Sequence, residues 1–512
     1  NCIDIEYFKF TLKRTTSDIF VLLGFGKDFI SLIPQFALDF WYVIVIWLLM
    51  IVLSEYLYEK VSGIKYQVLS AKKYYFIEIP AFLFLVTLFI IGARGGLQLR
   101  PINIINANEY TQPQNIPLVL NTPFTVIKTI FEEGMEEKIY SPGNELEKIY
   151  SPVQEFHNKE DFKNINVVLI IMESFSNEYI GVMTPEIKRE TFTPFLDSLA
   201  QHSLLFDRCY ANGKKSIEGI PAIVAALPSL MNNPFISSAY SGNEINGLAS
   251  VLKKKGYQTA FFHGGTNGTM GFDAFSKAAG FDKYFGRHEY NDDSDYDGHW
   301  GIYDEEFFQY FVRNLNEFRQ PFLGCFFSIS SHHPFTVPEK FNSVFKGGKL
   351  KIHKSVQYAD LSLKKFFDSA SKADWFKNTL FVITSDHTST TALPFYNTSA
   401  GAYSIPLLFY SPGRILPTIS HKITQQTDVL PSILDFLNYN EKFVAFGQSV
   451  FSQDSPGFSL SYMNNIYQMI SGESVLHFDG EEMAGLYDFK NDLLLKNNIL
   501  AKDSGKVKPL EQ

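Results

Sequence analysis

The chain has 512 residues, of which 46% are hydrophobic and 16% aromatic, and this composition excludes a disordered protein, a collagen and a small disulfide-rich scaffold. Its 45 basic and 54 acidic residues give a net charge of −9, which argues against a nucleic-acid-binding protein because a phosphate backbone requires a basic surface. The three cysteines, Cys2, Cys209 and Cys325, are widely separated and show no metal-ligand spacing.

Two apolar segments near the start, residues 36–58 and 74–93, are each close to the roughly 20 residues needed to cross a membrane, and both carry aromatic residues near their ends. We therefore predict two transmembrane helices within residues 36–93. The alternative is a pair of buried helices in a soluble protein. The loop between them, 59–73, carries four lysines, which favours a cytoplasmic loop and places everything after Arg94 outside.

The flanking segments are less informative. Residues 1–35 are expected to be a juxtamembrane segment, and because the chain starts at Asn1 rather than Met, we expect its N-terminus to be truncated. Residues 94–160 are polar and contain the hexapeptide EKIYSP twice, at 137–142 and 147–152. A repeat that occurs only twice is too short for a solenoid. We interpret this region as a connector.

Residues 161–512 have the pattern of an α/β domain. Continuous apolar runs typical of buried strands occur at 166–172, 256–264 and 379–387, and an amphipathic helical pattern occurs at 193–203. Strands that alternate with helices predict a mostly parallel sheet covered on both faces. In such sheets, ligands bind beyond the carboxyl ends of the strands.

Polar residues follow four of the predicted strands at that end. They are Glu173 after 166–172, His263 near the end of 256–264, His332 and His333 after 322–330, and Asp386 with His387 at the end of 379–387. Carboxylate oxygens with an imidazole suit Mn²⁺, Mg²⁺ or Zn²⁺. A single acidic residue at a strand end often only caps a loop. The coincidence of carboxylates and histidines at one edge of the sheet, however, predicts a metal site.

Ser216 is a candidate nucleophile. It follows Gly213, Lys214 and Lys215, precedes an apolar helical pattern, and is expected at the N-cap of that helix. One interpretation is that Ser216 only caps the helix. The other is that the free N–H groups and the helix dipole bind a phosphate beside a metal-activated hydroxyl. The two lysines either contact the phosphate or form a solvated basic turn.

Several motifs occur together in a defined order: NVVLIIMESFS, TPFLDSLA, ANGKKSIEGIPAIVAALPSL, AFFHGG, SSHHPF, VITSDHTS and QTDVLPSILDFL. In this order they resemble the alkaline phosphatase and sulfatase superfamily, and within it the lipoteichoic acid synthase-like phosphoglycerol transferases. The resemblance extends over about residues 160–495. It implies an α/β fold with a mostly parallel sheet flanked by helices, a small C-terminal α+β part and an N-terminal transmembrane helical anchor.

The resemblance also assigns roles to individual residues. It implies a metal site formed by Glu173, Ser216, Asp386 and His387, a catalytic set of Ser216, His263 and His332, and a substrate-binding set of Lys215, His263, His332 and His333. His332 is preferred over His333 for proton handling because it stands two residues before the proline. One divalent ion is expected, with manganese preferred and magnesium or zinc as alternatives.

The sequence departs from the family pattern at two places. The Trp and Arg that Gram-positive polymer synthases place seven to nine residues after the histidine of FHG are absent, since that stretch reads GGTNGTMGFD. This leaves the headgroup specificity open. Ser216 is also not followed by the Pro and Arg of a formylglycine sulfatase signature, which disfavours sulfate-ester hydrolysis.

The resulting hypothesis is a multi-pass enzyme of the bacterial cytoplasmic membrane with an extracytoplasmic catalytic domain. It would transfer phosphoglycerol from a phosphatidylglycerol-like phospholipid, through a covalent intermediate on Ser216, to a glycan or polyol-phosphate acceptor. The alternatives are a phosphoethanolamine transferase, a phosphodiesterase or a sulfatase-like hydrolase on the same fold, and a catalytically silent, metal-stabilised ectodomain that binds a glycan. His299 and Trp300 either line the substrate cleft or pack a loop.

Overall fold

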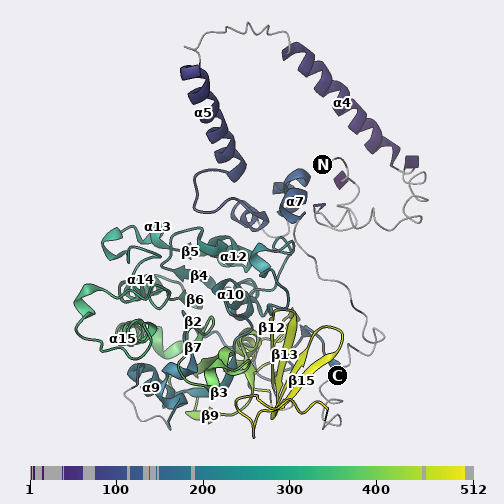
Figure 1. Ribbon diagram of the computed structural model, residues 1–512. Coiled ribbons are helices and arrows are strands. Elements are labelled where there is room, and N and C mark those ends of the chain that lie inside the picture. Colours follow the sequence, from purple (N-terminus) through teal and green to yellow (C-terminus); the bar gives the residue numbers. More distant parts are fainter. Residues whose placement is uncertain are drawn as a thin grey trace. The chain divides into compact units, whose positions relative to one another are not determined.

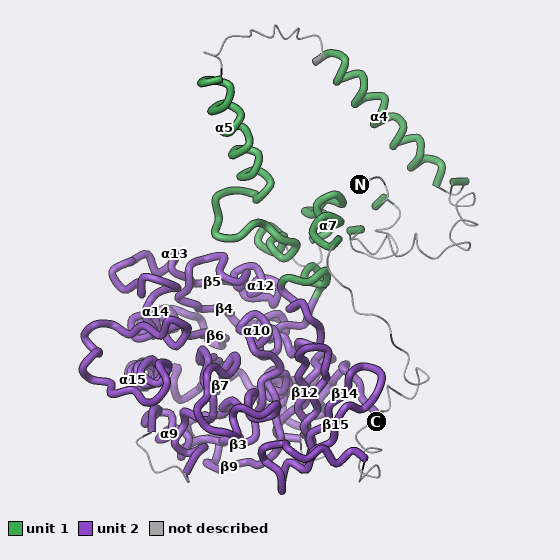
Figure 2. The backbone as a smooth tube through the Cα atoms, in the orientation of Figure 1, with its two compact units in different colours: residues 1–136, 237–244 green, residues 137–236, 245–512 purple. Residues whose placement is uncertain are grey.

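The computed structural model describes most of the chain and divides it into two compact units (Figure 2). The described residues are 2, 4–5, 14–15, 37–38, 40–61, 75–111, 116–130, 138, 146, 149–185, 191–452 and 457–501. The first unit comprises Asn1–Glu136 and Ser237–Glu244, and the second comprises Glu137–Ile236 and Ile245–Gln512. The domain boundaries inferred from the sequence stay predictions.

The described part of the first unit contains two long apolar helices, α4 (Trp41–Val61) and α5 (Tyr75–Arg94). Each is long and apolar enough to cross a membrane, and the apolar window of each is 0% buried within the protein. They correspond to the two predicted spans. The greater part of the predicted loop 59–73 lies outside the described residues, as do most of the segment 1–35 and most of the first EKIYSP copy.

Shorter elements also occur in the described part of this unit. They are a 3₁₀ helix (Ile104–Glu109), α6 (Ile116–Val119) and α7 (Thr122–Thr129). The side chain of Asn121 caps α7 by accepting a hydrogen bond from the backbone N–H of Phe124 (3.0 Å), as is typical of asparagine at a helix start.

The second unit is built around a nine-stranded sheet (Figure 1). In spatial order its strands are β10 (Thr424–Gln425), β3 (Leu204–Tyr210), β8 (Ser404–Tyr410), β7 (Thr379–Ser385), β2 (Asn166–Met172), β6 (Phe322–Phe327), β4 (Gln258–His263) and β5 (Lys283–Phe285), with β9 (Thr418–Ser420) paired to β3. Strand β8 is antiparallel to β3 and β7, whereas the other pairings are parallel. The predicted mostly parallel sheet is confirmed.

Four strands of this sheet determine where the polar residues meet. Strands β7, β2, β6 and β4 are consecutive neighbours and run in the same direction. The register of β2 on β7 is unbroken and ends with Met172 opposite Ser385. The residues that follow these strands therefore lie at one edge of the sheet.

The sheet is covered by helices on both faces, as the apolar sequence of β2 requires. All seven residues of β2 are buried, and every second one, beginning with Val168, joins a large core with residues of α9, α14 and α15. The remaining residues of β2 face the opposite side and are 0% exposed. The helices are α9 (Pro194–Ala200), α10 (Ser216–Ala225), α11 (Leu248–Lys253), α12 (Phe272–Ala278), α13 (Arg287–Tyr290), α14 (Asp304–Asn316), α15 (Ile352–Ala370) and α16 (Val429–Phe436).

A smaller antiparallel sheet follows α16 near the C-terminus (Figure 1). Its strands pair in chain order: β12 (Phe458–Met463), β13 (Ile466–Ser471), β14 (Ser474–Phe478) and β15 (Met483–Asp488). Two short strands, β1 (Val153–Gln154) and β11 (Phe443–Val444), form a separate antiparallel pair. The predicted C-terminal α+β part corresponds to α16 and this four-stranded sheet.

Three predicted strands are too long. Those predicted at 256–264 and 379–387 form β4 (Gln258–His263) and β7 (Thr379–Ser385), and the third shows the physical reason most clearly. The apolar run at 322–330 forms a strand only as far as Phe327. The backbone N–H groups of Ile329 and Ser330 then leave the ladder and donate to the carboxylate of Asp304, at 2.8 and 3.1 Å. A buried carboxylate that accepts two backbone N–H groups replaces the sheet as their partner.

The aromatic core between α14 and the sheet provides a test of this packing. Phe308 is fully buried, and its ring stacks on that of Phe326 with the centroids 3.8 Å apart. We expect Phe308→Ala to lower the free energy of unfolding by about 3–5 kcal/mol, because the truncation removes apolar contact and leaves a cavity. Denaturant unfolding of the detergent-solubilised protein measures this. Glu317→Ala, at an exposed position just after α14, is the control, and an equal loss in both variants would contradict the assignment of this core.

Candidate active site

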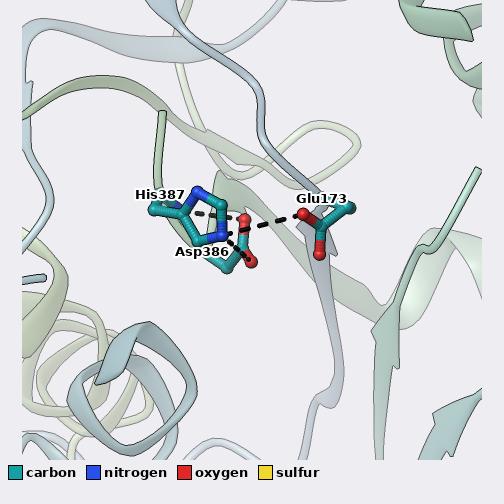
Figure 3. A group of neighbouring side chains, drawn as sticks. All are labelled: Glu173, Asp386 and His387. Atoms are coloured by element: carbon teal, nitrogen blue, oxygen red, sulfur yellow. Dashed lines mark hydrogen bonds and ion pairs between the residues drawn. The ribbon is translucent and has the colours of Figure 1, made fainter. Parts of the chain in front are cut away.

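Three side chains at the carboxyl edge of the sheet converge on one point (Figure 3). Glu173 follows β2, and Asp386 and His387 follow β7, so the adjacent parallel strands bring them together. One potential ligand atom from each of the three lies within 4.8 Å of the others. The imidazole Nε2 of His387 is 3.2 Å from Asp386 Oδ2 and 3.7 Å from Glu173 Oε1.

The two oxygens of Asp386 have different surroundings. Oδ1 accepts the backbone N–H groups of Ser174 and His387, each at 2.8 Å. Oδ2 is buried and has no hydrogen-bond partner among the described residues. A buried carboxylate oxygen without a donor is energetically unfavourable, and a cation at this point would satisfy it.

The tautomer of His387 also fits a cation. Its Nδ1 lies 2.8 Å from the carbonyl oxygen of Thr388. Because a carbonyl oxygen only accepts, Nδ1 carries a proton, and Nε2 is the nitrogen that a cation between Asp386 and Glu173 would bind. Metal-binding histidines are usually held in this way by a backbone carbonyl. The residues present therefore fit a divalent ion with oxygen and nitrogen ligands.

Glu173 lies in an environment that disfavours its charge. Burial, and then the neighbouring charge of Asp386, raise the pKa of Glu173 well above its usual value. Ser174 partly compensates, because its hydroxyl donates to Glu173 Oε1 at 2.6 Å. Ser174 has a left-handed backbone (φ 61°), and this turn lets its N–H reach Asp386 while its hydroxyl reaches Glu173. Two buried carboxylates side by side are the electrostatic condition that a bound cation relieves.

Ser216 lies beside this cluster. Its Oγ is 3.3 Å from Glu173 Oε2, to which it donates, and 3.3 Å from His387 Nε2. The prediction that Ser216 is the N-cap is wrong by one position, since Lys215 is the N-cap and Ser216 is the first residue of α10. The hydroxyl points to the two side chains instead of bonding to the backbone of its own helix. Capping is therefore not what its side chain does here.

The two lysines before Ser216 differ in their surroundings. Lys215 is largely exposed and pairs with Glu218 at 3.7 Å, so the structure does not bring its side chain into the cluster. Lys214 is half-buried, and its Nζ donates to Thr388 Oγ1 and to the carbonyl oxygen of Ala402 at 2.5 and 2.6 Å. Burial lowers the pKa of Lys214 to about 8. Lys214 thus ties the turn before Ser216 to the loop after His387.

Of the three predicted substrate-contacting histidines, His263 is the most buried, and its Nδ1 lies 3.2 Å from the carbonyl oxygen of Phe327. Burial lowers its pKa to about 4, so the ring is neutral at pH 7. His332 is half-buried, and burial lowers its pKa, which the nearby Asp386 and His387 also influence. His333 is exposed, and its ring contacts Phe335. Of the pair, His332 is the more buried.

Sequence reasoning missed two residues that hold the cluster together. Buried Gln426 donates from Nε2 to the carbonyl oxygens of Ser385 and Asp386 at 2.8 and 2.6 Å, and its Oε1 accepts the N–H of Asn212 at 2.8 Å. It therefore joins the strand end that carries Asp386 to the turn that carries Ser216. Gly219 is the second, because a Cβ built on it would lie 2.1 Å from the carbonyl oxygen of Asp386. The only available signal was their place in the quoted motifs.

The mostly parallel sheet, with this cluster at its carboxyl edge, is an alkaline phosphatase-like α/β fold. The chain belongs to the Sulfatase family, whose sequence model matches residues 165–439. It is thus an enzyme of the sulfatase-like type.

Named relatives agree with this assignment. The chain is 25% identical over 369 residues to lipoteichoic acid synthase 2 of Bacillus subtilis, covering 66% of this chain and 56% of that protein. It is 26% identical over 380 residues to a lipoteichoic acid synthase of Staphylococcus saprophyticus, covering 68% and 56%. The chain thus spans little more than half the length of these curated relatives.

Solved structures support the fold. A Vibrio parahaemolyticus protein of the alkaline phosphatase superfamily superimposes with a TM-score of 0.57 at 22% identity, covering 68% of this chain and 88% of that one. The lipoteichoic acid synthase LtaP of Listeria monocytogenes also gives a TM-score of 0.57, at 21% identity, covering 69% and 92%.

The close approach of α10 to Asp386 can be tested by the direction in which Gly219→Ala changes the stability of the protein. In an uncrowded helix, Gly→Ala raises stability by about 1 kcal/mol. At Gly219 the added methyl group meets the Asp386 backbone, so we expect Gly219→Ala to destabilise the second unit by roughly 1–3 kcal/mol. Thermal unfolding monitored by circular dichroism measures the change. Gly92→Ala, in α5 with nothing within 4 Å, is the matched control, and a stabilised Gly219→Ala protein would contradict the contact.

Proposed function

We propose that this protein is a membrane-anchored, metal-dependent transferase that moves phosphoglycerol from a phospholipid such as phosphatidylglycerol to an acceptor hydroxyl on a glycan or polyol phosphate. The observation that carries the proposal is the position of the Ser216 hydroxyl, 3.3 Å from both Glu173 and His387 at the first residue of α10. The names of the relatives, lipoteichoic acid synthases, support this choice of substrate class.

The start of α10 is suited to a phosphate group. The first N–H groups of a helix have no partner within it and, with the helix dipole, favour a bound anion. At this helix the side chain of Glu218 accepts the N–H groups of Lys214 and Lys215, at 2.8 and 3.2 Å, which fixes the preceding turn. Ser216 is thereby presented on a rigid element, as a nucleophile should be.

The proposed reaction has two steps that balance. In the first, the Ser216 hydroxyl loses its proton to solvent, Ser216 Oγ bonds to the phosphorus, the bond from phosphorus to the diacylglycerol oxygen breaks, and that oxygen takes a proton from a histidine. In the second, an acceptor hydroxyl gives its proton to the histidine and its oxygen bonds to the phosphorus, while the bond from phosphorus to Ser216 Oγ breaks and Oγ takes up a proton from solvent. A divalent ion held by Glu173, Ser216, Asp386 and His387 would stabilise the negative charge on the phosphoryl oxygens. We propose manganese, with magnesium and zinc as the other candidates.

His332 is the residue we propose for the proton transfer. Its Nδ1 lies 2.9 Å from the carbonyl oxygen of His333, which only accepts, so Nδ1 is protonated and Nε2 is the basic nitrogen of the neutral ring. Burial lowers its pKa, which makes the protonated ring a stronger acid toward a leaving oxygen. His263, with a pKa of about 4, stays neutral and is proposed as a substrate contact.

The two candidate spans support a location in a bacterial cytoplasmic membrane with the catalytic domain outside. Tethering an enzyme at the surface that holds its lipid substrate raises the effective concentration of that substrate without any additional contact. A phospholipid donor therefore suits a chain in which α4 and α5 precede the catalytic unit.

Metal binding is tested separately from activity. We expect MnCl₂ to raise the unfolding temperature of the parent protein after treatment with a chelator, because a ligand at about 100 times its Kd stabilises the folded state by roughly 2.7 kcal/mol. In Asp386→Asn this shift should be abolished or strongly reduced. Asp368→Asn, a surface carboxylate of α15 paired with Lys364, should keep it. Parallel titrations with Mg²⁺ and Zn²⁺ rank the metals, and an unchanged shift in Asp386→Asn would refute the site.

The nucleophile is tested with radiolabelled phosphatidylglycerol in mixed micelles. We expect Ser216→Ala to lower the release of diacylglycerol at least about a thousandfold, with metal-induced stabilisation reduced but not abolished, because three of the four proposed ligands remain. Ser216→Thr keeps a hydroxyl and should stay within roughly tenfold of the parent. Ser294→Ala, an exposed serine, is the control. Unchanged turnover in Ser216→Ala would exclude this nucleophile, and release from phosphatidylethanolamine alone would change the assigned headgroup.

A further inference from the structure

Trp300 stands on a short loop whose backbone is unusually well fixed. The carboxylate oxygen Oδ1 of Asp297 accepts the backbone N–H groups of His299, Trp300 and Gly301, at 2.8, 2.7 and 3.1 Å. The N–H of Asp297 in turn donates to the carbonyl oxygen of Gly301 at 2.9 Å. One carboxylate with three N–H partners holds the loop in a single conformation.

This loop is also joined to the segment after His263. Thr266 N–H donates to the carbonyl oxygen of Trp300 at 3.1 Å, and Gly265 forms a β-bridge with Gly301. A Cβ on Gly301 would lie 2.3 Å from the carbonyl oxygen of Gly264, so the two segments approach as closely as glycine allows. Trp300 is therefore fixed with respect to the strand that carries His263.

The side chain of Trp300 reaches the other histidine. Its indole Nε1 donates to the carbonyl oxygen of His333 at 2.6 Å, the same oxygen that faces His332 Nδ1. The ring centroids of Trp300 and His332 are 4.2 Å apart. Trp300 thus lies against the ring of His332.

Trp300 is not a core residue, because its side chain is partly exposed and its hydrogen bond to His333 is at the surface. A large aromatic residue that is held at its backbone and at its indole nitrogen, and that is only partly buried beside the histidine proposed for proton transfer, has the features of a ligand contact. Aromatic faces of this kind bind carbon-bound hydrogens and exclude water. They add nothing specific for a bare phosphate group.

We propose that Trp300 is a specificity-determining residue that contacts the carbon skeleton of the lipid headgroup while the phosphate lies at Ser216. This inference rests on the proposed function for the identity of the headgroup, but the contact itself does not require turnover. The expected ligand is a small phosphate ester whose glycerol-type carbon chain lies on the indole face. The site would then hold the phosphate through charge and distinguish the headgroup through Trp300.

The test is a binding comparison in the 512-residue protein carrying Ser216→Ala, saturated with MnCl₂, in detergent micelles. Isothermal titration measures the Kd of glycerol 1-phosphate, phosphoethanolamine and inorganic phosphate. We expect Trp300→Ala to weaken glycerol 1-phosphate binding roughly five- to tenfold, which is about 1.0–1.4 kcal/mol at 1.4 kcal/mol per tenfold and lies within the range of an aromatic contact. Inorganic phosphate should bind with an unchanged Kd. Trp300→Phe keeps a ring and should lose less than about threefold.

The controls separate contact from support. Trp47→Phe, in α4 and 54% exposed, should change no Kd, and unfolding temperatures identify a variant that fails to fold, in which case Trp300→Phe and Trp300→Leu are compared instead. An equal loss for glycerol 1-phosphate and inorganic phosphate, or no loss for either ester, overturns the proposal. If only phosphoethanolamine binding depends on Trp300, the contact holds and the proposed phosphoglycerol headgroup is wrong.

Discussion

The structure of the catalytic unit depends on the burial of two carboxylates next to each other. Glu173 and Asp386 are 2% and 0% exposed, and burial and mutual repulsion raise the pKa of Glu173. Removing a charge from water costs of the order of several kcal/mol even after the protein relaxes. The surrounding groups offset this only in part, since Asp386 Oδ2 has no hydrogen-bond donor among the described residues. Such an arrangement is reasonable in a protein that gains a cation there and unreasonable as packing alone.

Parallel strands and a small number of buried residues hold the two carboxylates next to each other. The register of β2 on β7 sets the two carboxylates side by side, and the left-handed Ser174 supplies hydrogen bonds to both. Gln426 then connects the Asp386 strand end to the turn before α10, while Gly219 lets that helix approach the Asp386 carbonyl. Gln426 and Gly219 are not among the residues proposed to bind the metal. Their role is to set the distance between Ser216 and the carboxylates.

Much of the fold and of the site could be predicted from the sequence. The features that could not be predicted share one cause. Strand β2 coincides with the predicted 166–172, because a continuous β-branched run buried on both faces has few other structures available. The positions of the polar residues after the strands could also be predicted, because parallel strands end at the same edge of the sheet. The end of β6 and the position of Ser216 were wrong because each depends on a distant partner, Asp304 in one case and Glu173 in the other. Gln426 was missed for the same reason, since a long-range hydrogen bond leaves no periodic pattern.

His263 and His332 differ in their burial and therefore suit different roles in the site. His263 is packed against Phe327 at 4.6 Å between ring centroids and is neutral at pH 7, so it can contact a substrate without adding charge. His332 is closer to solvent, and the carbonyl oxygen of His333 fixes its tautomer and also anchors Trp300. A single backbone carbonyl therefore orients both the proposed proton carrier and the proposed headgroup contact. No side-chain substitution removes this carbonyl oxygen. Because Trp300 and His332 both depend on it, it couples the recognition of the headgroup to the geometry of proton transfer.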